Sequence, residues 1–162
     1  MMVDPIRIIA CLGMENVMGQ LAVFTEIAPD IFERAIAGTD PDPTGSRQHS
    51  IDKAWDSLHV VLRSKGPPLS LAISGDCIHP QGRHSLDQFI QGHHDYYIAL
   101  MSPGLVQEVA KAFTNVTAAE FKQWQSRLGG ERHSAAELFF PQLKAAYREA
   151  AAAQNALMIV IA

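Results

Sequence analysis

Three polar side chains in the segment 50–62 have the types and the spacing that acid–base chemistry requires. Asp52, Asp56 and His59 are separated by four and three positions, so on a helix each comes within reach of its neighbour in the series. An Asp–His pair that lines a cleft can act as a general base and the group that orients it. A structural interpretation stands beside this one: Asp52 supports the start of the helix, and the other two flank its buried side. Lys53 is either a solvated side chain or the partner of a carboxylate, and the sequence leaves both open.

A second group of residues with metal-binding types lies in the segment 76–95. Its members are Cys77, His79, His84, His93, His94 and Asp95. Their spacing does not match a zinc finger, a zinc knuckle or the His-Glu-x-x-His arrangement, so we predict no metal and no cofactor. His93, His94 and Asp95 remain candidate binding residues. A histidine-rich loop that senses pH is a further hypothesis, because histidine changes charge near neutral pH.

The position of the first group depends on a helix that the sequence predicts over residues 50–62. Apolar residues three and four positions apart form one stripe, at Ile51, Ala54, Trp55, Leu58, Val61 and Leu62. Ser50 is placed to cap the first turn, and Asp52 then lies near the positive end of the helix dipole. Trp55 carries the largest apolar surface of the segment, so we expect it in the core with a partner for its indole N–H. It also counts among the candidate binding residues.

Three further segments are predicted to be strands, at residues 20–26, 96–101 and 156–161. The last is apolar on both faces, which is typical of a central strand. The sequence therefore predicts an α+β domain with a small mixed sheet that four or five helices cover.

Local signals predict where those helices begin and end. Pro29 fits the first turn of a helix that runs to about Ala37, and Ser102 with Pro103 begins another. Thr117 to Glu120 form a capping box. The segments 38–50 and 76–95 have no periodic pattern and are predicted to be loops, and Pro141 is predicted to break or kink the helix around it.

Composition limits the class of protein. The chain has 162 residues, of which 48% are hydrophobic and 19% charged, which is typical of one globular domain. A net charge of −4 and scattered basic residues argue against a nucleic-acid partner. Two cysteines favour a reduced, cytoplasmic setting, and no stretch is long enough to span a membrane. A protein partner is the remaining candidate, and the oligomeric state is left open.

Several short motifs make the chain similar to a bacterial family of domains of unknown function, the YfbM-like family. The most specific is the run Asp52-Lys53-Ala54-Trp55; others are Met18-Gly19, Gly66-Pro67-Pro68-Leu69 and Leu100-Met101-Ser102-Pro103. The resemblance covers residues 18–162 and leaves residues 1–17 as an extension of uncertain origin. It implies a compact protein of helices and strands, and it brings no established reaction and no functional residue.

The leading functional prediction is a non-catalytic binding or protein-interaction module. No reactive constellation is recognisable, the net charge is mild, and the resembling family has no known reaction. The alternative is a small hydrolase-like enzyme, with or without a metal, that uses Asp52, Asp56 or His59 and the segment 76–95 as a lid.

Overall fold

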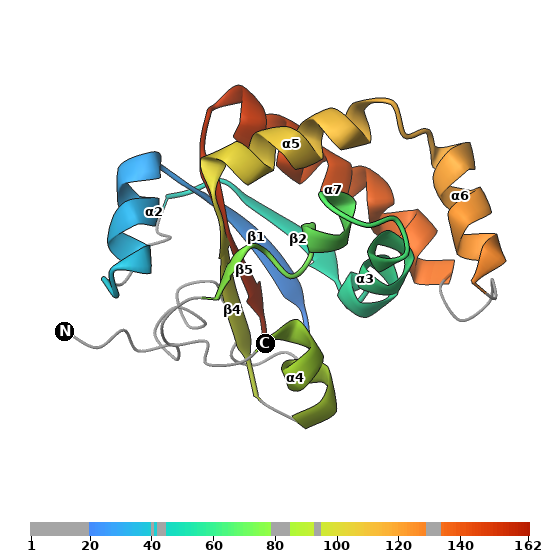
Figure 1. The fold of residues 1–162 in the computed structure, drawn as a ribbon, viewed down its shortest axis with the longest axis horizontal. Coiled ribbons are helices and arrows are strands. Elements are labelled where there is room, and N and C mark those ends of the chain that lie inside the picture. Colours follow the sequence, from blue (N-terminus) through green and yellow to red (C-terminus); the bar gives the residue numbers. More distant parts are fainter. Residues whose placement is uncertain (1–19, 40, 42–44, 79–84, 93–94, 129–133) are drawn as a thin grey trace.

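The computed structural model describes residues 20–39, 41, 45–78, 85–92, 95–128 and 134–162. They form three layers, with a twisted sheet between α2 on one side and α3, α5 and α7 on the other (Figure 1). The helices and strands are, in chain order, β1 (Ala22–Ile27), α2 (Pro29–Ile36), β2 (Gln48–Asp52), α3 (Trp55–Arg63), the 3₁₀ turn η1 (Leu69–Leu71), β3 (Cys77–Ile78), α4 (Leu86–Gly92), β4 (Tyr97–Met101), α5 (Pro103–Thr114), α6 (Ala118–Arg127), α7 (Ser134–Ala152) and β5 (Ala156–Ile161).

The sheet has the strand order β2-β1-β5-β4-β3, with β5 at its centre. Ile159 of β5 lies opposite Phe24 of β1 on one side and Ala99 of β4 on the other. The α+β class and the three predicted strands are confirmed. The sheet is antiparallel in all four pairings rather than mixed, and the described residues form six α-helices rather than four or five. Strand patterns in a sequence identify strands but do not fix their direction.

Side chains alternate between two apolar clusters along each central strand. The odd-numbered residues of β5, such as Ile159, face α3, α5 and α7, whereas Met158 and Val160 face α2. All of them are buried, which is why β5 is apolar throughout. The larger cluster on the side of α7 contains Trp55.

The junction between β2 and α3 differs from the predicted helix over residues 50–62. Residues 48–52 are an edge strand paired with β1, and the helix begins only at Trp55. Ser50 Oγ accepts a hydrogen bond from Asp52 N at 3.2 Å and does not cap the helix, and Asp52 adopts a φ of +50° at the turn. Ile51 is buried in either arrangement, so the apolar spacing did not distinguish strand from helix.

Two other predictions differ from the structure, the second of them in part. Within the predicted loop 76–95 the structure has a short strand, β3, and a helix, α4, whose Leu86 and Phe89 are buried. Pro141 is predicted to break or kink its helix, but it lies inside a continuous α7, so the helix is not broken there. The buried residues Phe140, Leu143 and Tyr147 on either side of it hold the helix together, because packing of an apolar face can offset one missing backbone hydrogen bond.

The predicted helix caps are confirmed for α5 and α6. Ser102 Oγ accepts a hydrogen bond from Leu105 N at 3.3 Å, and Thr117 Oγ1 accepts one from Glu120 N at 3.1 Å. Pro29 occupies the first turn of α2, as predicted. Each of these signals lies within a few residues of the start of its helix, so the helix start could be predicted without the tertiary fold.

Candidate functional site

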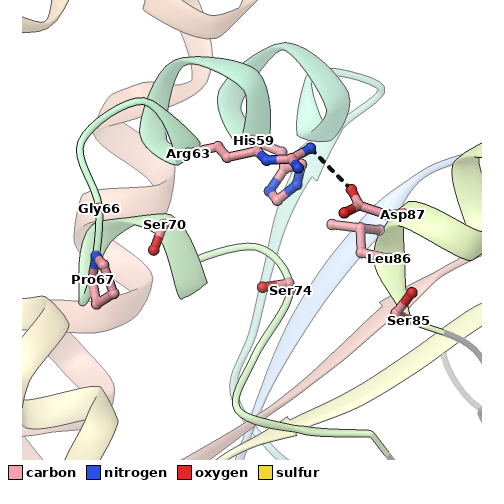
Figure 2. Close-up of a pocket in the computed structure, with 9 residues that line it drawn as sticks. All are labelled: His59, Arg63, Gly66, Pro67, Ser70, Ser74, Ser85, Leu86 and Asp87. Carbon is pink, nitrogen blue, oxygen red and sulfur yellow. Dashed lines mark hydrogen bonds and ion pairs between the residues drawn. The ribbon is translucent and has the colours of Figure 1, made fainter.

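A pocket of about 440 Å³ lies between α3, the turn that follows it and the start of α4. Its volume is within the range of about 300–1,000 Å³ that small-molecule sites occupy. Figure 2 shows His59 and Arg63 projecting from α3, with Asp87 and Leu86 of α4 opposite them. The polar lining consists of His59, Arg63, Ser70, Ser74, Ser85 and Asp87.

Local structure places each wall of this pocket. His59 and Arg63 are four residues apart on α3, so they share one side of the helix. Ser85 caps α4: its Oγ accepts a hydrogen bond from Gln88 N at 3.1 Å, and its N–H donates to Gln88 Oε1 at 2.9 Å. This reciprocal pair fixes the helix start that carries Asp87.

Contacts with the sheet position Ser74 in the lining of the pocket. The hydroxyl of Tyr97 on β4 donates a hydrogen bond to the backbone carbonyl of Ser74. The next residue, Gly75, has a φ of +71°, and a Cβ there would lie 2.7 Å from the carbonyl oxygen of Leu100. Only glycine fits this close approach, so the chain holds Ser74 against the end of β4.

His59 is the buried titratable group of the pocket. The residue is 6% exposed, and its Nδ1 has no hydrogen-bond partner in the described part of the chain. Burial lowers the pKa of His59 below its ordinary value, the carboxylate of Asp87 opposes that shift, and the charge of Arg63 adds to it. The imidazole is therefore neutral at neutral pH, and a buried polar nitrogen without a partner favours a ligand that supplies one.

An ion pair between Arg63 and Asp87 forms part of the pocket's lining. The guanidinium nitrogen lies 3.1 Å from the carboxylate oxygen, and the two side chains are 63% and 51% exposed (Figure 2). Exposed pairs of this kind contribute only about 0–1 kcal/mol. A ligand with its own anionic group can therefore compete with Asp87 for the five N–H donors of Arg63.

Of the predicted site residues in the segment 50–62, His59 alone lines this pocket. Asp52 ends β2, Lys53 lies in the turn after it, and both are exposed. Asp56 is exposed on the first turn of α3, where its Oδ1 accepts a hydrogen bond from Ser57 N at 2.7 Å. Trp55 is buried, as predicted, and its indole N–H donates to the carbonyl of Gln20 at 3.2 Å.

The second predicted group is only partly described. His79, His84, His93 and His94 lie outside the described residues. Asp95 is exposed just before β4. Cys77 lies on β3, where burial and then the neighbouring Asp76 raise the pKa of its thiol; the carboxylate of Asp76 itself accepts hydrogen bonds from the N–H and hydroxyl of Ser102.

Sequence reasoning missed Arg63, Asp87 and the three serines as site residues. The spacing of His59 and Arg63 was a usable signal, because four residues on a helix place two polar side chains together. No such signal indicated Asp87. The segment that contains it was predicted to be a loop, and Asp87 lies 24 positions after Arg63 in the chain.

Comparisons with known proteins concern the fold and the family. A family model described as "Domain of unknown function (DUF1877)" matches residues 18–127. The solved structure of YfbM from Escherichia coli, a protein of unknown function, is similar to this chain with a TM-score of 0.61 and 20% sequence identity. The match covers 88% of this chain and 99% of that one. No curated protein matches. Among the described residues no helix combines the length and the apolar character needed to cross a bilayer.

Proposed function

We propose that this chain, which belongs to the DUF1877 family of domains of unknown function, is a non-catalytic binding module for a small molecule that carries an anionic group. The observation that carries the proposal is the pocket beside α3. It brings together a buried imidazole nitrogen, which has no hydrogen-bond partner among the described residues, and a guanidinium that an exposed ion pair holds.

The chemistry of the lining defines the class of ligand. Arg63 provides a planar set of donors that suits a carboxylate or a phosphate. His59 provides one neutral nitrogen, and Ser70 and Ser74 provide hydroxyl groups that donate and accept. A small, polar and anionic molecule satisfies all of these groups at once.

The hydrolase-like alternative has less support. Its acid–base pair needs Asp52 or Asp56 beside His59, and neither carboxylate is among the residues that line the pocket. His59 and residues 85–87 of the segment 76–95 do meet there, which is compatible with binding and requires no reaction. A protein partner remains a prediction.

The test is an NMR titration of the full chain with inorganic phosphate in one series and citrate in another. We expect saturable shifts of the backbone amides of residues 59–74 and 85–87. The Arg63→Gln variant should bind about tenfold or more weakly, because a hydrogen bond to a charged group contributes about 1.5–3 kcal/mol. Tighter binding of inorganic phosphate would indicate that the anionic group of the ligand is a phosphate, and tighter binding of citrate would indicate a carboxylate.

Arg34→Gln is the matched control. Arg34 forms an exposed ion pair with Asp30 at 3.3 Å, with side chains that are 62% and 74% exposed, but it lies on α2 on the other side of the sheet. It should leave the titration unchanged. Shifts that avoid the pocket in both series, or equal weakening by the two arginine variants, would remove the proposal.

A further inference from the structure

A second cluster of titratable side chains lies where β1, β2 and α7 meet. Its members are Glu26 of β1, His49 of β2 and Glu149 of α7. Glu26 is on the same side of β1 as Phe24, because side chains alternate along a strand. His49 is directly opposite Phe24 in the register, so it also faces the helix layer. Both side chains therefore point toward α7, which supplies the third.

The three side chains bring their ligand atoms to one point. His49 Nε2 lies 3.1 Å from Glu149 Oε2 and 3.6 Å from Glu26 Oε2, and all three atoms lie within 4.8 Å of one another. Zinc bonds to nitrogen and oxygen are about 2.0–2.2 Å long, so tetrahedral ligands lie roughly 3.3–3.5 Å apart. The spacing around His49 is already that of a set of metal ligands.

Two of these atoms are buried without a hydrogen bond. Among the residues that the structure describes, neither Glu26 Oε2 nor His49 Nε2 has a hydrogen-bond partner. The side chain of Glu26 is 4% exposed. Asn155 donates to the other carboxylate oxygen, Oε1, at 3.3 Å, which leaves Oε2 directed at His49 and Glu149. A buried carboxylate oxygen in this position is costly unless a cation or a donor satisfies it.

The exposed side chain of Arg47 partly neutralises these carboxylates. Its guanidinium lies 3.4 Å from Glu26 Oε2 and 3.4 Å from Glu149 Oε2, and its side chain is 55% exposed. One guanidinium balances one of the two carboxylates. A divalent cation bound between the carboxylates would neutralise both, and the exposed arginine is free to withdraw into solvent.

We propose that Glu26, His49 and Glu149 form a binding site for a divalent transition-metal ion of the zinc type. One imidazole and two carboxylates suit Zn²⁺, whereas Mg²⁺ and Ca²⁺ prefer six or more oxygen ligands. Three protein ligands leave a fourth position for water beside Glu149, which is 35% exposed. The ion would fasten the edge strand β2 to both β1 and α7. This site does not depend on the pocket beside α3.

The test is a calorimetric titration of the untagged full chain with Zn²⁺ alone, followed by thermal unfolding with and without the ion. We expect one ion per chain from this site, a rise in the melting temperature, and no comparable effect of Mg²⁺. Glu149→Gln and His49→Gln should abolish this binding. Arg47→Gln should tighten it several-fold, because the variant removes the competing cation. Co²⁺ at the site should give the intense visible absorption of a four-coordinate ion.

Glu108→Gln is the matched control, since Glu108 is an exposed carboxylate on α5 that does not belong to the cluster, and it should not alter binding. Glu26→Gln tests the buried ligand; if that variant does not fold, the more exposed Glu149 answers the same question. Binding that survives both His49→Gln and Glu149→Gln would place the ion elsewhere in the chain and overturn the proposal. Absence of binding in both the wild type and Arg47→Gln would overturn it as well.

Discussion

At the scale of single residues, the environment of His59 decides its chemistry. The imidazole is buried on the inner side of α3, with Arg63 on the same helix and Asp87 on α4 as its charged neighbours. Burial removes water from the charged form and lowers the pKa of the imidazole, although Asp87 partly restores it. The same residue type on an exposed loop would titrate normally, so the sequence position alone did not define its protonation state.

This lowered pKa predicts how stability depends on pH. Below the ordinary value of 6.5 the unfolded chain binds a proton at His59 that the folded chain binds less readily. The free energy of unfolding therefore decreases as the pH falls through 6.5, by at most about 1.4 kcal/mol per pH unit, and levels off below the pKa of the folded state. Above 6.5 the contribution is complete. His59→Gln should remove this part of the slope.

Urea unfolding of the wild type and His59→Gln at a series of pH values from above to below 6.5 measures the effect. Other titrating groups contribute equally to both proteins, so the difference between the two curves isolates His59. A difference that stays constant through the whole series would show that burial does not shift this histidine.

At the scale of elements, α7 illustrates how packing overrides a local rule. Pro141 has no N–H to donate to the carbonyl of residue 137, and within a helix such a proline costs about 3 kcal/mol or more. The helix nevertheless continues from Ser134 to Ala152, because Leu143 and Tyr147 beyond the proline are buried against the sheet and the neighbouring helices. The predicted break at Pro141 is therefore wrong, although the cost of a proline inside a helix remains.

Pro141→Ala should therefore stabilise the protein. Pro141 is exposed, so alanine restores a backbone hydrogen bond and removes the clash without emptying the core. We expect the free energy of unfolding to increase by about 1–3 kcal/mol in urea titrations followed by circular dichroism. Gln142→Ala, at the exposed neighbouring position, is the control and should change it by less than about 0.5 kcal/mol. A destabilised Pro141→Ala protein would mean that the proline shapes a bend that the packing requires.

At the scale of the whole molecule, Trp55 ties together segments that are far apart in the chain. Its indole N–H donates to the carbonyl of Gln20 before β1, and its ring lies 5.8 Å from that of Phe89 on α4. The same cluster reaches Tyr97 at the start of β4, whose ring is 5.9 Å from Phe89. These contacts join α3, α4 and the sheet.

Trp55→Ala should lower the free energy of unfolding by about 3–5 kcal/mol, as measured by chemical denaturation. Trp55→Phe keeps an aromatic ring against Phe89 and loses the hydrogen bond to Gln20, so it should cost only about 1–2 kcal/mol. Trp124→Ala, at a half-buried tryptophan of α6, should cost less than Trp55→Ala. Equal losses at the two tryptophans would contradict the central position of Trp55.

The sequence by itself determined those helices and strands whose formation depends on residues within a few positions of one another. The serine cap of α5, the proline at the start of α2 and the fully apolar β5 are read correctly because each is set by backbone chemistry or burial within a few positions. The α+β class followed from these elements. The run Asp52-Lys53-Ala54-Trp55 and the other short motifs suggested the family, and the family model that matches residues 18–127 confirms it.

Only the tertiary structure decided the features that join residues far apart in the chain, namely the edge strand β2, the pocket and the proposed metal site. The edge strand β2 has a mostly exposed, polar pattern and forms because β1 offers it backbone hydrogen bonds. The pocket pairs His59 and Arg63 with Asp87, and the proposed metal site joins Glu26, His49 and Glu149 across 123 positions of the chain. Apart from His59 and Arg63, which are four residues apart on α3, the members of the two sets have no characteristic spacing. The distances between such side chains are set by strand register and helix packing, which no short window of sequence contains.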